Sequence, residues 1–180
     1  MPETKRDFIP VRFSVLTVSD SRSMEDDKSG ATLVERIEQA GHVLTDRKIV
    51  PDDIHRIRRT VASMCADANV DAVIVTGGTG FTGRDVTPEA LEPLFEKRMD
   101  GFSHVFHRIS YEKIGTSTIQ SRATAGLIEH KYVFALPGSP GACRDAWDHI
   151  LKDQFDYRHK PCNFVEIMPR LDEHLQRKKG

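Results

Sequence analysis

A glycine-rich segment followed by two charged residues is the part of this sequence best suited to chemistry. Residues 76–80, Thr-Gly-Gly-Thr-Gly, follow the short apolar run 72–75, which is rich in β-branched residues. Glycines let a backbone turn sharply and approach a ligand closely, and free N–H groups in such a turn bind anions. Just beyond, Arg84 has the chemistry to bind phosphate oxygens and Asp85 to bind a metal ion. The segment therefore predicts a site for an anionic ligand.

Two aspartates are candidates for catalysis or metal binding. Asp52 precedes a predicted helix, where an acid also complements the helix dipole, and its spacing alone favours this structural role. Asp85 lacks that explanation, because Thr87 is expected to be the N-cap of the next helix, with Pro88 at its first position. For Arg84 the alternative is a surface ion pair with Asp85, which would stabilise the protein little.

Alternating strands and helices are expected to position these residues. The apolar patterns predict strands over residues 12–18, 42–50, 72–75 and 132–136. The helices predicted between and after them are one capped by Ser29 and ended by Gly41, one starting at residues 51–53, one from Thr87, one around residues 102–109, and one capped by Ser139. This order predicts an α/β fold, a three-layer sandwich around a mostly parallel sheet.

The predicted topology brings the candidate residues to one place. In an open parallel sheet, ligands bind beyond the carboxyl ends of the strands. The loops at those ends cover residues 19–22, 51–53, 76–85 and 137–140, and all are rich in Ser, Thr, Asp, Gly or Pro. Asp20, Asp52 and Asp85 would therefore share one edge with two glycine turns. This arrangement predicts a pocket for a phosphorylated ligand and a divalent cation.

Composition limits the function classes. The chain has 180 residues, of which 38% are hydrophobic and 29% charged, and its net charge of −1 predicts no nucleic-acid partner. No apolar run approaches the roughly 20 residues of a membrane span, and residues 1–10 lack the apolar core of a signal peptide. Cys65, Cys143 and Cys162 match no disulfide or zinc spacing. We expect a cytoplasmic protein with an N-terminal arm (1–10), one α/β domain (11–168) and a polar tail (169–180).

Two other patterns suggest different sites. Residues 78–83 match G-x-G-x-x-G, but the following helix starts only near Thr87 and the preceding strand is the third, so dinucleotide binding is disfavoured. His104 and His107 are spaced to share a helix face as metal ligands, yet no third ligand is near, which favours a solvated or packing role. Cys65 and Trp147 are expected in the core.

The motifs taken together resemble a known family. TVSDSR, EDDKSG, IVPDD, VTGGTGFTGRDVTPEA, GTSTIQSR, LPGSPGACRDAW and PCNF occur in this order between residues 8 and 164. This series is similar to that of the molybdenum cofactor biosynthesis protein B family, which belongs with the molybdopterin adenylyltransferases. The glycine loop with its RDVTPEA continuation is the most specific part of the match.

The resemblance implies a fold, an activity and partners. It implies a molybdopterin-binding α/β fold that assembles as a homotrimer or as a hexamer of two trimers. The implied reaction joins AMP from Mg-ATP to the terminal phosphate of molybdopterin and releases pyrophosphate. ATP is thus the co-substrate and Mg²⁺ the cofactor, and the downstream molybdenum-insertion enzyme is a further possible partner.

The resemblance also assigns residues. Asp52 and Asp85 match the two catalytic aspartates of the family, which overrides the structural interpretation of Asp52, and both would hold the metal. The residues implied in substrate binding are Ser19, Asp20, Thr76, Gly77, Gly78, Thr79, Gly80, Arg84, Ser121, Arg122, Pro137, Gly138 and Ser139.

One departure from the family pattern keeps an alternative open. Residues 101–104 are Gly-Phe-Ser-His where the family commonly has Gly-Phe-Gly-Glu, so His104 replaces an acid near the expected site. Retention of Arg84, Asp85 and Asp52 favours an active enzyme. The alternative is a non-catalytic molybdopterin carrier or scaffold.

Overall fold

A sheet at the centre of the molecule organises the fold in this computed structural model, which describes residues 5–176. Within these residues the sheet has six strands in the order β2-β1-β3-β6-β5-β4. The strands are β1 (Arg12–Val18), β2 (Val43–Val50), β3 (Ala72–Thr76), β4 (Lys97–Arg98), β5 (Thr124–Ile128) and β6 (Lys131–Leu136). The first four in sheet order are parallel, whereas β5 is antiparallel to β6 and to β4. The mostly parallel sheet is confirmed.

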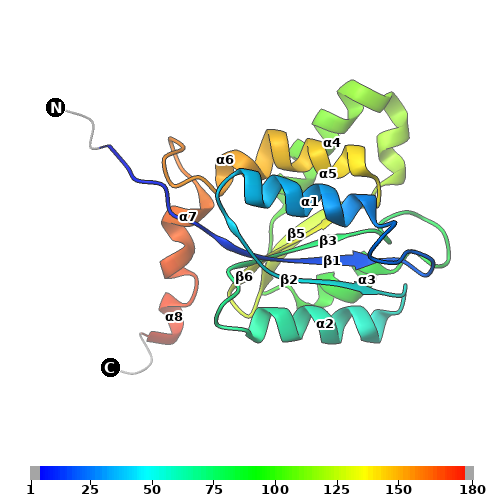
Figure 1. Cartoon of the computed structure of the whole chain (residues 1–180), viewed down its shortest axis with the longest axis horizontal. Helices are drawn as coiled ribbons and strands as arrows, with labels where there is room; N and C mark the ends of the chain where they lie inside the picture. Colours follow the sequence, from blue (N-terminus) through cyan, green and yellow to red (C-terminus); the bar gives the residue numbers. More distant parts are fainter. Residues whose placement is uncertain (1–4, 177–180) are drawn as a thin grey trace.

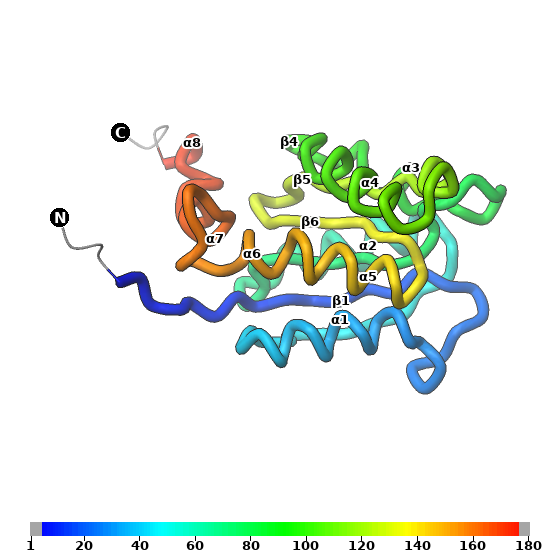
Figure 2. Tube along the Cα trace, turned by 90° about the horizontal axis from the view of Figure 1, so that it is seen from above, coloured from blue at the N-terminus to red at the C-terminus, as the bar shows by residue number. Residues whose placement is uncertain are grey.

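Helices cover both faces of the sheet and complete three layers (Figures 1 and 2). One face carries α1 (Lys28–Gln39), α4 (Asp100–Ile114) and α5 (Pro140–Ala146), and the other carries α2 (Ile54–Ala66) and α3 (Thr87–Leu91). Successive strand residues point to opposite faces. In β1, Phe13 and Val15 therefore enter the core under α1 and α5, while Leu16 and Val18 enter the core under α2.

The antiparallel hairpin at the far edge was not predicted. Its strand β5 has the sequence Thr-Ala-Gly-Leu-Ile, whose Ala and Gly belong to the residues depleted in strands. Gly126 is required there, because a Cβ would lie 2.5 Å from the Phe95 ring. Glu129 and His130 form the turn to β6 with positive φ angles of 49° and 59°. Tertiary packing, rather than local propensity, therefore selects this strand.

Three predicted element boundaries are corrected by the structure. Helix α1 is capped by Asp27, whose carboxylate accepts the Gly30 N–H at 3.0 Å, and not by Ser29. Thr87 is the first residue of α3 and not its N-cap, since its hydroxyl donates to the Gly77 carbonyl at 2.8 Å. Strand β2 begins after His42. The Ser139 cap of α5 is confirmed, with its hydroxyl accepting the Ala142 N–H at 3.1 Å.

The remaining helical segments follow α3, α4 and α5. The 3-10 turns Glu92–Leu94 and Gly115–Gln120 extend α3 and α4, and a wider turn, Trp147–Leu151, joins α5 to α6 (Lys152–Gln154). The chain ends with α7 (Phe164–Ile167), the turn Met168–Arg170 and α8 (Glu173–Gln176). Among residues 5–176, no helix combines the length and the apolar character that crossing a bilayer requires.

Both ends of the described chain lie on the side of the sheet where the parallel strands begin (Figure 1). In the predicted N-terminal arm, Phe8 packs against His42 with ring centroids 5.1 Å apart, whereas Ile9 is exposed. Arg6 forms an ion pair with Glu166 of α7 at 3.0 Å. Helix α8 lies in the segment predicted as a polar tail, and residues 1–4 and 177–180 of these two segments lie outside the described residues. The carboxyl ends of the parallel strands, on the opposite side, are therefore surrounded by the loops that follow the strands.

Candidate functional site

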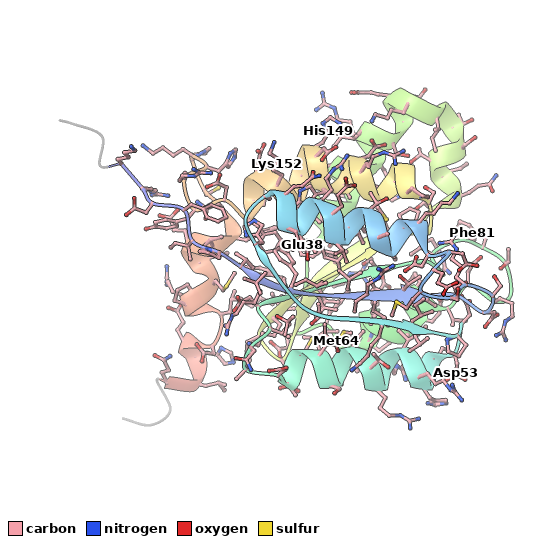
Figure 3. All side chains as sticks on the ribbon, viewed as in Figure 1. Glu38, Asp53, Met64, Phe81, His149 and Lys152 are labelled. Carbon is pink, nitrogen blue, oxygen red and sulfur yellow. The ribbon has the colours of Figure 1, made fainter. Side chains whose placement is uncertain are left out.

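A cavity of about 590 Å³ lies at the carboxyl ends of the parallel strands. It is lined by Val18, Ser19, Asp20, Ser21, Arg22, Asp52, Gly77, Gly78, Thr79, Gly80, Asp85, Ser117, Gln120, Ser121, Pro137, Gly138 and Ser139. Figure 3 labels Phe81 and Asp53, the N-cap of α2, at this end of the molecule. The predicted convergence of the four strand-end loops is confirmed.

The first glycine turn needs its glycines for two different reasons. Gly77 and Gly78 have φ angles of 101° and 69°, in the region that residues with side chains rarely adopt. A Cβ on Gly77 would also lie 2.3 Å from the Val18 carbonyl oxygen, and one on Gly78 would lie 2.4 Å from the Thr87 hydroxyl and 3.0 Å from Asp52 Oδ1. The turn therefore brings its backbone directly against the Asp52 carboxylate.

Asp52 lies in an environment that opposes its negative charge. Burial raises the pKa of Asp52, and the nearby carboxylates of Asp20 and Asp85 raise it further, against a smaller opposing effect of Arg84. The capping role belongs instead to Asp53, whose carboxylate accepts the Arg56 N–H at 2.8 Å. Asp52 therefore directly precedes the N-cap of α2 and does not itself cap the helix.

Asp20 is paired across the cavity edge. Arg84 donates from Nε and Nη2 to the Asp20 carboxylate at 2.8 and 2.9 Å, and the Asp52 N–H donates to Asp20 Oδ1 at 3.0 Å. These contacts hold the pKa of Asp20 below its ordinary value, Arg84 making the larger contribution. Arg84 thus pairs with Asp20 and not with its neighbour Asp85. Its side chain is 67% exposed and is not among the cavity-lining residues.

Asp85 is held by its own loop. Its Oδ2 accepts the Thr82 N–H at 2.9 Å and the Thr82 hydroxyl at 2.7 Å. The same oxygen lies 2.7 Å from the position that a Cβ on Gly80 would occupy, so the carboxylate is stacked on the glycine turn. The structure therefore brings Asp85 and Asp52 to the same turn, against Gly80 and Gly78 respectively.

Two residues implied in substrate binding lie behind the cavity instead. Thr76 is fully buried, and its hydroxyl donates to the Pro137 carbonyl at 2.9 Å with Cys143 Sγ 3.3 Å away. Arg122 donates to the Gly80 carbonyl at 2.7 and 3.0 Å and to the Asp85 carbonyl at 3.2 Å. Thr76 therefore joins the two glycine turns, and Arg122 braces the loop that carries Asp85.

Arg122 is itself fixed from two further sides. Its guanidinium forms an ion pair with Glu89 of α3 and lies over the Phe81 ring, with Cζ 5.3 Å from the ring centroid. Its backbone N–H donates to the Thr79 carbonyl at 2.9 Å. These contacts hold the segment before β5 against the glycine loop.

The two histidines of α4 do not form a metal site. His104 is exposed and is not among the residues lining the cavity. The ring nitrogens of His107 lie 2.7 Å from the Ser103 carbonyl oxygen and 2.8 Å from the Ser121 carbonyl oxygen. No cluster of three or more His, Cys, Asp or Glu residues placed to hold a metal occurs within residues 5–176. His107 instead ties α4 to Ser121 in the cavity wall.

The second turn packs directly on the first. A Cβ on Gly138 would lie 3.1 Å from Gly77 Cα, so the two turns approach as closely as glycine allows. The Ser19 hydroxyl, also implied in substrate binding, accepts the Arg22 N–H at 3.1 Å and shapes its own loop. The sequence analysis missed five lining residues, namely Val18, Ser21, Arg22, Ser117 and Gln120. All five lie in motifs quoted above, TVSDSR and GTSTIQSR, so their position in these motifs was the signal that could have found them.

Comparison with known proteins identifies the family of this chain. The family model described as "Probable molybdopterin binding domain" matches residues 14–157. The molybdenum cofactor biosynthesis protein B of Escherichia coli K12 is 47% identical over 164 residues, which cover 91% of this chain and 96% of that protein. The chain belongs to the molybdopterin-binding domain family.

Other members of the family extend the comparison. A protein of Methanocaldococcus jannaschii, named a probable molybdopterin adenylyltransferase, is 41% identical over 80% of this chain and 89% of its own length. The crystal structure of a molybdenum cofactor biosynthesis protein B superimposes with a TM-score of 0.84 at 38% identity, over 93% of this chain and 99% of that one. The tungsten cofactor synthesizing protein of Pyrococcus furiosus superimposes with a TM-score of 0.73 at 37% identity, over 81% and 93%. The expected molybdopterin-binding α/β fold is confirmed.

Proposed function

We propose that this protein is a molybdopterin adenylyltransferase that acts in molybdenum cofactor biosynthesis. The observation that carries the proposal is the placement of Asp52 and Asp85 against one glycine turn, at the ligand-binding edge of a molybdopterin-binding fold. The relative from Methanocaldococcus jannaschii supports the activity by its name.

The proposed reaction is a phosphoryl-group displacement. A terminal phosphate oxygen of molybdopterin attacks the α-phosphorus of ATP, and the bond from that phosphorus to the bridging oxygen breaks. AMP is thereby joined to molybdopterin, and the electron pair of the broken bond leaves with pyrophosphate. Such transfers depend mainly on alignment and on stabilisation of phosphate charge. The rigid double turn at Gly77 and Gly138 supplies the alignment, and Arg122 holds the Asp85 loop in place.

The donor set fits a magnesium ion. Mg²⁺ is commonly held by one or two carboxylates, with water and substrate phosphates completing its shell. Asp52 and Asp85 line the cavity, and the repulsion that Asp20 and Asp85 exert on Asp52 is of the kind that a divalent cation relieves. We assign Asp52 and Asp85 as the residues that would hold it, where it would offset charge on the phosphates.

A molybdopterin carrier without chemistry is the second candidate. The sequence feature that favours it is His104, in the position of the usual family acid. Because His104 is exposed on α4 and outside the cavity wall, this replacement leaves the lining residues intact. The location of His104 therefore weakens the carrier interpretation.

Self-association is a further part of the proposal. Helix α4 and the turn after it expose four large apolar side chains: Val105 by 46%, Tyr111 by 58%, Ile114 by 56% and Ile119 by 72%. Contiguous exposed apolar patches mark surfaces that another chain covers, and these four side chains are candidates for contacts of this kind. We propose a homotrimer or a hexamer of two trimers, and sedimentation equilibrium at micromolar concentration tests it, since a monomeric mass would contradict it.

Incubation with molybdopterin and Mg-ATP tests the activity. We expect adenylyl-molybdopterin and pyrophosphate in equal amounts, and a requirement for Mg²⁺ that removal by a chelator reveals. Tight molybdopterin binding without either product would establish the carrier instead. Co-purification with the molybdenum-insertion enzyme tests the proposed downstream partner. Cell fractionation tests the cytoplasmic location.

A further inference from the structure

Arg22 is the one basic side chain among the residues that line the cavity within residues 5–176. The other charged lining residues are the acids Asp20, Asp52 and Asp85. A cavity for phosphorylated substrates needs positive charge as well as metal-binding carboxylates, because phosphate oxygens are recognised best by charged donors. Arg22 is therefore the residue from which an anion subsite can be built.

The Arg22 side chain is fixed across the cavity wall. Its Nη2 donates to the Gly138 carbonyl at 3.0 Å and its Nη1 to the Ser29 hydroxyl at 3.2 Å. The Ser29 hydroxyl in turn donates to the same Gly138 carbonyl at 2.9 Å. Two groups, the Ser29 hydroxyl and the Gly138 carbonyl, thus hold the guanidinium between the start of α1 and the second turn, so little rotamer freedom remains to be lost on binding a ligand.

Most of the donors of Arg22 remain available. A guanidinium has five N–H groups. Two of them donate to Ser29 and Gly138, and the other three have no hydrogen-bond acceptor in the part of the chain that the structure describes. The side chain is 36% exposed and lines the cavity, so donors that Ser29 and Gly138 do not use are open to a ligand there. Paired donors of this kind match the oxygens of a phosphate group.

The charge behind Arg22 does not cancel its own. The buried carboxylate of Asp27 lies 4.0 Å from Arg22 Nη1 but is bound more closely by Arg47 at 3.1 Å. Asp27 also accepts hydrogen bonds from the Thr17 hydroxyl at 2.6 Å and the Gly30 N–H at 3.0 Å. Two guanidinium groups therefore share one carboxylate, so Asp27 does not neutralise Arg22 by itself.

Arg22 and Asp52 lie towards opposite faces of the sheet. Arg22 is held by residues at the starts of α1 and α5, which cover one face, whereas Asp52 directly precedes α2 on the other face. We propose that Arg22 binds the phosphate oxygens of a substrate on the α1–α5 side of the cavity, opposite Asp52. The identity of this substrate rests on the proposed function, which supplies two sources, ATP and molybdopterin.

Titration calorimetry with metal-free inorganic tripolyphosphate tests the subsite directly. We expect Arg22→Gln to weaken tripolyphosphate binding by at least about tenfold, the usual size of a lost charge-assisted hydrogen bond. Arg22→Lys should fall between that variant and the wild type, because an ammonium cannot hold Gly138 and a phosphate in the same planar geometry. Arg108→Gln, which removes a charge that is 82% exposed on α4, is the matched control and should bind like the wild type.

Adenosine separates ligand binding from positioning of the Gly138 turn. We expect adenosine to bind the wild type and Arg22→Gln equally, whereas an equal loss of adenosine and tripolyphosphate would assign Arg22 a positioning role and overturn the proposal. Titrations with Mg-ATP and with molybdopterin identify the source, because affinity falls for the substrate whose phosphate Arg22 contacts. Unchanged tripolyphosphate binding in Arg22→Gln, or no binding by the wild type at millimolar concentration, would also overturn it.

Product formation is followed in parallel to keep the two proposals distinct. Normal adenylylation together with phosphate binding that does not depend on Arg22 would contradict the proposed subsite and support the proposed function. Phosphate binding that depends on Arg22, without product, would support the subsite and contradict the function.

Discussion

The two ends of the parallel strands, here called the amino edge and the carboxyl edge of the sheet, differ in the kind of side chain that gathers there. At the amino edge, aromatic rings surround Phe13, whose centroid lies 4.9 Å from that of Phe155, 5.4 Å from His42 and 5.5 Å from Trp147. The one titratable ring in this group, His42, is 7% exposed and accepts the Val11 N–H at 3.1 Å on Nδ1. Apolar packing therefore dictates the charge state here.

At the carboxyl edge, charges gather around backbone turns. Asp52 keeps its carboxylate against Gly78 even though Asp20 and Asp85 repel it, and Gly77 adopts a positive φ. The positive φ suits glycine, whereas the repulsion at Asp52 opposes folding. The contrast indicates that stability is concentrated at one edge of the sheet, while the other edge retains unfavourable contacts that a ligand would relieve.

Replacement of Asp85 should give the largest effect and confine it to function. Asp85→Asn is expected to lower the rate of adenylylation by about 100- to 1,000-fold, because the negative charge in the cavity is lost. Folding should persist, since the amide oxygen still accepts the Thr82 N–H. Asp53→Asn is the matched control, because asparagine is an equally good N-cap and Asp53 does not line the cavity. Unchanged turnover in Asp85→Asn would remove Asp85 from the mechanism.

Acid should weaken the amino edge first. Burial lowers the pKa of His42 from 6.5 to about 4, so the folded protein holds this ring neutral after the unfolded chain has protonated it. The stabilising contribution is complete above pH 6.5 and is lost as pH falls towards 4, amounting to about 3 kcal/mol in the free energy of unfolding. Urea unfolding between pH 7 and pH 4 measures it. The same slope in His42→Gln would assign the acid sensitivity to another group.

Removal of the Asp52 charge should separate stability from activity. Because the fold raises the pKa of Asp52, the charged form costs stability, and this cost grows as pH rises above the ordinary value of 3.8. Asp52→Asn should therefore melt about 1–3 °C higher than the wild type at pH 7 in the presence of a chelator, with no gain below pH 3.8. The same variant should lose adenylylation. A lower melting temperature at pH 7 would show that Asp52 supports the fold.

The smallest effect is expected at His104. Because this side chain is exposed and outside the cavity wall, His104→Glu should change turnover by less than about twofold. A tenfold gain would show that the family acid acts on the site from α4, and would extend the functional edge beyond the cavity lining. Steady-state rates with saturating Mg-ATP decide between these results.

Much of this architecture could be predicted from local sequence. The run 72–75 was recognisable as a strand because β-branched residues suit a buried parallel sheet, and β3 occupies Ala72–Thr76. The positions of Asp20, Asp52 and Asp85 at one edge followed from the order of strands and helices, since parallel strands end on the same side. The turn at Gly77 and Gly78 was predicted because three of the five residues 76–80 are glycines. Periodicity and chain order were sufficient for all of these features.

Only the tertiary structure decided which polar groups pair. Arg84 pairs with Asp20, 64 residues away, instead of the adjacent Asp85. Arg122 braces Gly80 over 42 residues, and Arg22 reaches Gly138 over 116. Strand β5 likewise forms because Gly126 fits against Phe95, not because its residues favour a strand. A long flexible side chain has several possible partners along the sequence, and the folded backbone alone determines which of them lies within hydrogen-bond distance.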